Sequence, residues 1–132
     1  MKKQTILIVD DAPENIELLY LVLSSTYNIK VALNGDKALE IAFKSGDQPD
    51  LILLDVMMPG MDGYEVCRQL KASSSTNKIP VIFISALGQA EDESRGFEVG
   101  AVDFIPKPIS LAIVRARVKT YLALNNKDQL LE

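Results

Sequence analysis

The fold is decided by residues 51–63, which read Leu-Ile-Leu-Leu-Asp-Val-Met-Met-Pro-Gly-Met-Asp-Gly. The four apolar residues before Asp55 are typical of a short strand that is buried on both faces of a sheet. Pro59 and Gly60 then interrupt the chain, and a helical pattern follows from Tyr64 to Ala72. This stretch therefore predicts a buried strand, a loop and a helix, in that order.

The same succession of strand and helix occurs on both sides of this stretch. Short apolar runs predict further strands, while helical spacing, an opening proline and closing glycines mark further helices. We expect strands at residues 5–9, 29–33, 51–54, 81–84 and 102–105, helices at 13–23, 38–42, 64–72, 89–99 and from Ser110 onward, and a turn at Asn34 and Gly35. Because parallel strands need crossover connections, this alternation predicts an α/β fold with a doubly wound parallel sheet covered by helices on both faces.

Length and composition limit the classes of protein to which the chain can belong. With 132 residues, of which 48% are apolar and 24% charged, it is predicted to form one globular domain. Its net charge of -4 argues against direct binding of nucleic acid, whose phosphates attract basic surfaces. The apolar runs are too short for a signal peptide or a membrane span, and the single cysteine, Cys67, is interpreted as a packing residue. We therefore expect a cytoplasmic domain that does not bind membranes.

The sequence contains no histidine. Serine and cysteine nucleophiles that depend on a histidine base are therefore excluded, and so is every metal site with a histidine ligand. The chemistry that remains belongs to carboxylates, hydroxyl groups and lysine.

Polar residues stand where four of the predicted strands end. Asp10 and Asp11 follow the first strand, Asp55 the third, Ser85 the fourth and Lys107 the fifth. The carboxyl ends of parallel strands form one edge of the sheet, so these side chains are expected to share a crevice. Two carboxylates about 4 Å apart repel by roughly 4 kcal/mol at an effective dielectric constant near 20, so a cation must offset their charge.

Lys107 or a divalent ion could supply that positive charge, and Mg²⁺ prefers carboxylate, water and phosphate oxygens. A carboxylate beside Mg²⁺, with a hydroxyl and an ammonium group nearby, could attack a phosphoryl group and become an aspartyl phosphate. Taken singly, each residue has a simpler interpretation. Asp10 and Asp11 could cap a helix, Asp55 and Ser85 could form turns, and Lys107 could lie on the surface. Their coincidence at four strand ends favours the phosphoryl hypothesis.

Together these residues resemble the receiver domain of two-component response regulators. The resemblance covers residues 5 to about 122 and rests on Asp10-Asp11, residues 53–63, Ser85-Ala86 and Lys107-Pro108. It implies a flavodoxin-like fold with five strands in the order 2-1-3-4-5. It also implies that Asp55 accepts a phosphoryl group from a sensor histidine kinase or a histidine phosphotransfer protein. The donor must be a separate molecule, since this chain has no histidine. The domain would catalyse its own phosphorylation and slow dephosphorylation without being a conventional enzyme.

The resemblance further implies a role for each residue of the site. Mg²⁺ would be bound by Asp10, Asp11, Asp55 and the backbone carbonyl of Met57, and the phosphoryl oxygens would be held by Ser85 and Lys107. Phosphorylation would draw Ser85 toward the phosphate and let Phe104 turn inward, which would change the face formed by residues 89–99, 102–105 and 110 onward. The bond between Lys107 and Pro108 would be cis. Outside this motif context, Phe104 reads as a core residue.

The expected domain organisation is a receiver domain over residues 1–122. Residues 123–132 continue the last helix, and a linker to an output domain outside this chain could begin there. A homodimer could form by pairing the acidic residues Glu91, Asp92, Glu93 and Glu98 with Arg115, Arg117 and Lys119. The alternatives are a receiver used only for docking, a flavin-binding electron carrier and an aspartate-nucleophile phosphatase. The acidic loop after the first strand argues against a flavin phosphate, and the adjacent aspartates lack the Asp-x-Asp spacing of the phosphatases.

Overall fold

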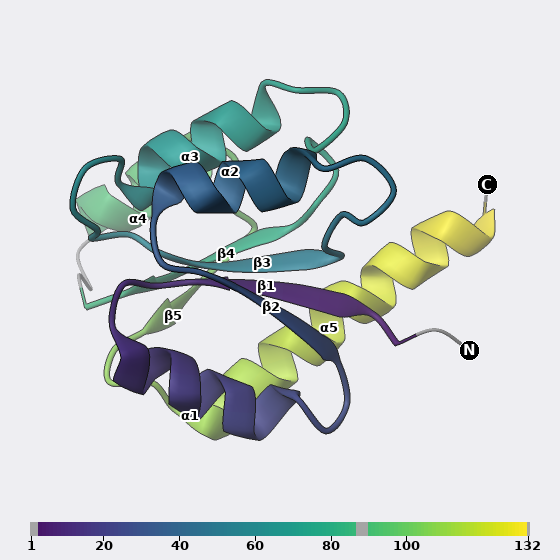
Figure 1. Cartoon of the computed structure of the whole chain (residues 1–132), viewed down its shortest axis with the longest axis horizontal. Coiled ribbons are helices and arrows are strands. Elements are labelled where there is room, and N and C mark those ends of the chain that lie inside the picture. The colour runs from purple at the N-terminus through teal and green to yellow at the C-terminus, as the bar shows by residue number, and fades with distance from the viewer. Residues whose placement is uncertain (1–2, 87–89, 132) are drawn as a thin grey trace.

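The computed structural model describes residues 3–86 and 90–131 of the chain (Figure 1). Strands and helices alternate through it, as the sequence predicts. The strands are β1 (Thr5–Val9), β2 (Asn28–Ala32), β3 (Leu51–Asp55), β4 (Val81–Ser85) and β5 (Asp103–Pro106). The helices are α1 (Pro13–Leu23), α2 (Gly35–Phe43), α3 (Gly63–Lys71), α4 (Ala90–Glu98) and α5 (Leu111–Leu131).

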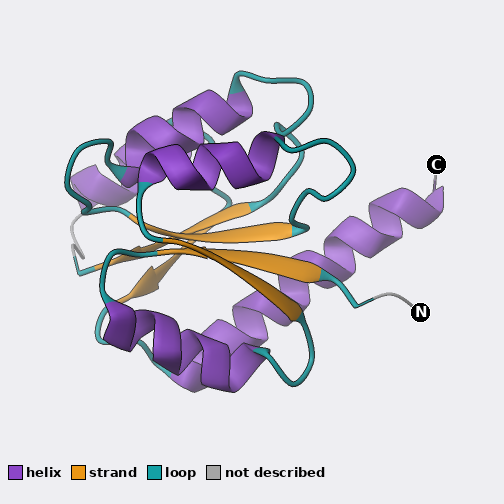
Figure 2. Ribbon diagram, in the orientation of Figure 1, coloured by secondary structure: helices purple, strands orange, loops and turns teal. Residues whose placement is uncertain are grey.

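The strands form a parallel sheet in the order β2-β1-β3-β4-β5. Helices α1 and α5 cover one face of this sheet, and α2, α3 and α4 cover the other (Figure 2). The predicted fold class, a doubly wound α/β sheet of order 2-1-3-4-5, is confirmed.

The central strand β3 explains why the strands of this sheet are unbroken apolar runs. Ile52 and Leu54 belong to the core that includes α2 and α3, whereas Leu51 and Leu53 belong to the core that includes α1 and α5. All four side chains are fully buried. Alternate residues of a strand face opposite sides, and both sides of this strand are covered by helices, so neither set can be polar.

The predictions fail at the edge of the sheet. We expected a strand as far as residue 33, but β2 ends at Ala32, and the side chain of Leu33 is exposed. Asn34 and Gly35, which we expected in a turn, begin α2 instead. The Asn34 side chain caps this helix by accepting a hydrogen bond of 2.8 Å from the amide of Lys37. An edge strand pairs with a neighbour on one side only, so an apolar residue such as Leu33 can follow it without belonging to the sheet. The start of the helix, in contrast, is set by the capping hydrogen bond.

Two predicted helix ends agree with the structure. Gly100 follows α4 with a φ of 108°, a conformation that glycine adopts without strain. Ser110 precedes α5, and its hydroxyl oxygen accepts a hydrogen bond of 3.4 Å from the amide of Ile113. The predicted start of α4 at Gln89 lies outside the described residues, and β5 begins and ends one residue later than predicted.

Helix α5 has 21 residues and continues beyond the end of the sheet (Figure 1). Val114, Val118 and Leu122 are buried at three- and four-residue spacing, so the first half of α5 is the half that packs on the sheet. Among the described residues, no helix has both the length and the apolar character that crossing a membrane requires.

Candidate functional site

The polar residues singled out in the sequence lie at the carboxyl edge of the sheet. Asp10 directly follows β1, Asp55 and Ser85 are the last residues of β3 and β4, and Lys107 directly follows β5. Carboxylate oxygens of Asp10, Asp11 and Asp55 all lie within 4.8 Å of one another. The order of the strands therefore brings together acidic side chains that are 45 residues apart in the sequence.

Asp10 is almost fully buried, and helix α1 holds its side chain in place. One carboxylate oxygen accepts a hydrogen bond of 2.9 Å from the amide of Ala12, and the other accepts one of 3.2 Å from the side chain of Asn15. The interpretation of Asp10 and Asp11 as helix caps is wrong, because the N-cap of α1 is Ala12 and no side chain makes a capping hydrogen bond there. The two donors instead offset the loss of hydration of the buried Asp10 carboxylate. Asp11 is exposed. No sequence pattern indicated the contribution of Asn15.

Asp55 is 2% exposed, and the Lys107 Nζ lies 3.0 Å from its Oδ1. Burial raises the pKa of Asp55 and the charge of Asp10 raises it further, whereas the hydrogen bonds from Lys107 and from the Met57 amide lower it. The net result is a pKa above the usual value, so the ionised carboxylate is held in an unfavourable environment. A cation near the cluster would stabilise it. The peptide bond from Lys107 to Pro108 is cis.

The segment after β3 packs its backbone tightly against Asp55. The Met57 amide donates a hydrogen bond to the Asp55 carboxylate, while the Met57 side chain is exposed, so only the backbone of Met57 belongs to the site. Gly63 begins α3, and a Cβ atom there would lie 2.5 Å from the Asp55 carbonyl oxygen and 2.9 Å from the Val56 Cα. Glycine at residue 63 therefore lets α3 begin directly on the backbone that carries Asp55.

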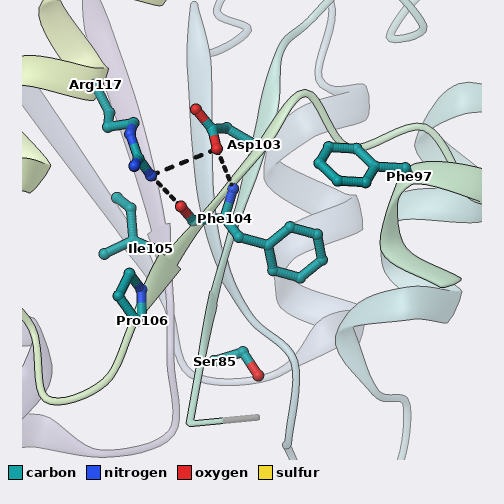
Figure 3. A pocket seen from close by; sticks show the side chains of 7 residues that line it. All are labelled: Ser85, Phe97, Asp103, Phe104, Ile105, Pro106 and Arg117. Atoms are coloured by element: carbon teal, nitrogen blue, oxygen red, sulfur yellow. Dashed lines mark hydrogen bonds and ion pairs between the residues drawn. The ribbon is translucent and has the colours of Figure 1, made fainter. Parts of the chain in front are cut away.

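A pocket of about 220 Å³ lies at β5, between α4 and α5 (Figure 3). It is lined by Ser85, Phe97, Asp103, Phe104, Ile105, Pro106 and Arg117. Ser85 is 4% exposed and borders the pocket from the end of β4, at the same edge of the sheet as Asp55. Of the residues singled out in the sequence, Ser85 and Phe104 line this pocket, together with residues of α4, β5 and α5.

Phe104 belongs to a chain of four aromatic rings. Its ring centroid lies 5.5 Å from that of Phe83 and 5.3 Å from that of Phe97, and Phe83 in turn lies 5.3 Å from Tyr64. Tyr64 belongs to α3, Phe83 to β4, Phe104 to β5 and Phe97 to α4. Phe104 is half-buried, so it packs against the core and also lines the pocket.

Helix α5 is tied to β5 through Asp103. The Arg117 guanidinium donates a hydrogen bond to the Phe104 carbonyl and lies 3.4 Å from a carboxylate oxygen of Asp103, while the Tyr121 hydroxyl donates one of 2.9 Å to the other oxygen. In the sequence Arg117 was only one of several basic residues on a helix. Helical periodicity identifies an apolar face, but it does not reveal which partner a polar side chain finds across the fold.

Comparisons with known proteins agree with this geometry. A sequence profile of the response regulator receiver domain matches residues 6–119. A probable cyclic di-GMP phosphodiesterase of Vibrio cholerae is 48% identical over 129 residues, which are 96% of this chain and 29% of that protein. The response regulator PleD of Caulobacter vibrioides is 47% identical over 116 residues, which are 87% of this chain and 25% of that protein. The chain spans less than a third of the length of these two relatives.

Solved structures show the same architecture. A putative response regulator from Chloroflexus aurantiacus has a TM-score of 0.86 at 36% identity, over 92% of this chain and 99% of that one. The BeF3-activated receiver domain of DrrB from Thermotoga maritima has a TM-score of 0.82 at 32% identity, over 93% of this chain and 99% of that one. The profile match over most of the chain, the identity of the relatives and the shared sheet order show that this chain belongs to the response regulator receiver domain family.

Proposed function

We propose that this receiver domain is a phosphorylation-dependent signalling switch in which Asp55 is the phosphoryl acceptor. One observation carries the proposal: three carboxylates lie within 4.8 Å of one another, with the ammonium of Lys107 3.0 Å from Asp55. Burial beside Asp10 raises the pKa of Asp55, so the cluster works against the stability of the fold. Ionisable groups that are held in such an environment are typical of reactive sites.

The proposed donor is a phosphohistidine on a sensor histidine kinase or a histidine phosphotransfer protein. A carboxylate oxygen of Asp55 attacks the phosphorus, a new O–P bond forms as the P–N bond breaks, and the imidazole nitrogen leaves with the bonding electron pair. Lys107 stabilises the charge on the transferred oxygens, and the Ser85 hydroxyl donates a further hydrogen bond to them. Attack by water on the acyl phosphate later restores the carboxylate and releases inorganic phosphate.

The residues of the cluster fit Mg²⁺. Asp10, Asp11 and Asp55 offer carboxylate oxygens, which are the hard ligands that this ion prefers, and the Met57 carbonyl is the proposed fourth protein ligand. When bound, the ion would neutralise negative charge on the carboxylates and on the phosphoryl group. Asp10 is oriented for this role by the hydrogen bonds that it accepts from Ala12 and Asn15, and Asp55 by the one from Lys107.

The proposed output of the switch is the face formed by α4, β5 and α5. Ser85 would move toward the phosphate and Phe104 would turn inward, which would change the surface around the pocket. Glu98 on α4 and the basic residues Arg115 and Lys119 on α5 are exposed with opposite charges, so a homodimer through this face is part of the proposal. The side chains of the other acidic residues expected there, Glu91, Asp92 and Glu93, lie outside the described residues.

The proposed receiver unit is residues 1–122, with residues 123–132 continuing α5 toward a linker. We place it in the cytoplasm, because its lone cysteine is buried and free. Its net charge of -4 argues against direct contact with nucleic acid or membrane. A receiver used only for docking would not need the acidic cluster. A flavin-binding carrier would need phosphate donors where β1 ends in two aspartates.

Intact mass spectrometry tests the proposal most directly. Incubation with acetyl phosphate in Mg²⁺ should add one phosphoryl group that hydroxylamine removes, and EDTA should suppress the adduct. Asp55→Asn should abolish the adduct, whereas Glu17→Gln, which removes an exposed carboxylate on α1, should retain it. An adduct that persists in Asp55→Asn, or none in the wild type from either acetyl phosphate or a cognate kinase, would refute the proposal.

A second variant separates phosphorylation from the response. Lys107→Ala should leave the fold intact and still accept a phosphoryl group, but it should not transmit the change to the face of α4, β5 and α5. Amide chemical shifts measured before and after phosphorylation report this. A response equal to that of the wild type would remove Lys107 from the proposed mechanism.

A further inference from the structure

Gly96 lies inside helix α4, directly against the ring of Phe104. A Cβ atom built at Gly96 would lie 2.9 Å from the Phe104 Cε2 and 3.0 Å from the Phe83 Cδ2, and it would come closer still to the Phe104 Cζ. These distances are shorter than any ordinary contact between carbon atoms. No side chain fits between α4 and the two rings as they stand.

The backbone at Gly96 does not itself require glycine. The described glycines with a positive φ are Gly46, Gly60 and Gly100, so Gly96 has a conformation that any residue adopts in a helix. Glycine inside a helix is less favourable than alanine because it loses more backbone entropy on folding. The contact with the aromatic rings is therefore the structural feature that accounts for glycine at this position.

The Phe104 ring also has a space beside it. It lines the pocket of about 220 Å³ that Ser85 also borders (Figure 3). The ring is held on the other side by α4, through Gly96 and through Phe97 at a centroid distance of 5.3 Å. Phe104 and Phe97 of α4 both line this pocket, so a displacement of the ring or of α4 would change its shape.

We propose that Gly96 is the positioning residue for Phe104, and that its missing side chain couples the position of α4 to the position of the ring. A side chain at residue 96 would separate the two, because either the ring or the helix would have to move away. The signalling consequence rests on the proposed phosphorylation switch. The pairing of Gly96 with Phe104 does not, so the two can fail separately.

A double-mutant cycle tests the pairing without any phosphorylation. The variants are Gly96→Ala, Phe104→Leu and both together, with Ser94→Ala as the control, because Ser94 is exposed on the same helix. Gly96→Ala should lower the urea midpoint of unfolding in the wild-type background, against the gain expected from helix propensity. With Phe104→Leu it should lower the midpoint much less, since leucine lacks the outer ring atoms that the new methyl group meets and only the contact with Phe83 at 3.0 Å remains. Equal shifts of the midpoint in both backgrounds would overturn the pairing.

Fluorine NMR of protein labelled with fluorophenylalanine tests the consequence for signalling. The chain has four phenylalanines, and the spectrum of Phe104→Leu assigns the resonance of Phe104. In Gly96→Ala without phosphate, this resonance should already be displaced from its wild-type position. After acetyl phosphate treatment, the Asp55 adduct should form as in the wild type, but the resonance should change much less. Ser94→Ala should respond like the wild type.

The outcomes of the two experiments distinguish this inference from the proposed function. If the wild type takes up no phosphoryl group, the proposed function fails, while the double-mutant cycle still decides the pairing of Gly96 with Phe104. If Gly96→Ala is phosphorylated and its Phe104 resonance changes as much as in the wild type, Gly96 is only a packing residue and the inference is overturned.

Discussion

Replacing Asp55 with asparagine should stabilise the domain in the absence of divalent ions. The substitution keeps the shape of the side chain and an oxygen that can accept the hydrogen bond from Lys107, but it removes the charge. Burial is the largest cause of the raised pKa of Asp55, and the Asp10 carboxylate within 4.8 Å adds a repulsion of about 3 kcal/mol at an effective dielectric constant near 20. The attraction of Lys107 at 3.0 Å, about 5 kcal/mol on the same scale, opposes both. Because the pKa is nevertheless raised, burial and repulsion together outweigh this attraction, and the expected gain in the free energy of unfolding is about 1 kcal/mol.

Urea denaturation at neutral pH with EDTA, followed by circular dichroism, measures this difference. The pKa of Asp55 is raised in the folded state, so the folded protein binds this proton more tightly, and the penalty of ionisation is present only above the raised pKa. The gain from Asp55→Asn should therefore shrink as the pH falls through the raised pKa, and it should be absent below 3.8, the usual pKa of the carboxyl group. Mg²⁺ should stabilise the wild type more than the variant, which lacks one ligand.

The matched control is Glu17→Gln, which removes one exposed carboxylate from α1 and should change the stability little. If Asp55→Asn proves no more stable than the wild type in EDTA, the carboxylate cluster is not repulsive and the reasoning is wrong. Equal stabilisation of the wild type and Asp55→Asn by Mg²⁺ would show that the ion binds elsewhere.

Three further predictions concern the packing around the site. Burial raises the pKa of the Cys67 thiol to about 11, so the folded state keeps this proton more tightly than the unfolded state. The free energy of unfolding should therefore fall as the pH rises from 9.0 toward 11. Cys67→Ala should not show this decrease in urea titrations across that range. Gly63→Ala should lower the free energy of unfolding by about 1 to 3 kcal/mol, since its methyl group would meet the Asp55 carbonyl oxygen, and an unchanged urea midpoint would contradict that packing. Tyr121→Phe should cost about 1 kcal/mol by removing the hydrogen bond to Asp103, and calorimetry at neutral pH measures that loss.

The sheet was predictable because its central strands are buried on both faces. Before their last residues, Asp55 and Ser85, β3 and β4 are apolar toward both faces of the sheet, so they stand out as unbroken runs, and turn residues separate them from the helices. The end of β2 and the start of α2 were predicted wrongly, because β2 is an edge strand and Asn34 can serve either a turn or a helix cap. Local sequence does not choose between those two uses.

The positions of the site residues were predictable for a topological reason. Parallel strands deliver their last residues to one edge, so the order of elements alone placed Asp10, Asp55 and Lys107 together. Asn15, Gly96 and Arg117 were not found in the same way. Each of them acts through a partner on another element, at a distance that only the folded chain defines. A glycine whose role is to leave room for a ring has no local pattern that identifies it.

The length of helix α5 would amplify a small motion at the sheet. Its first half is fixed to β5 through Arg117 and Tyr121, and its second half continues as the same helix beyond the sheet. From Arg117 to Leu131 the helix rises about 21 Å at 1.5 Å per residue. A tilt of about 5° at the anchored end would therefore sweep the far end sideways by about 2 Å. Displacements too small to alter the compact body would thus be magnified at the tip of this lever.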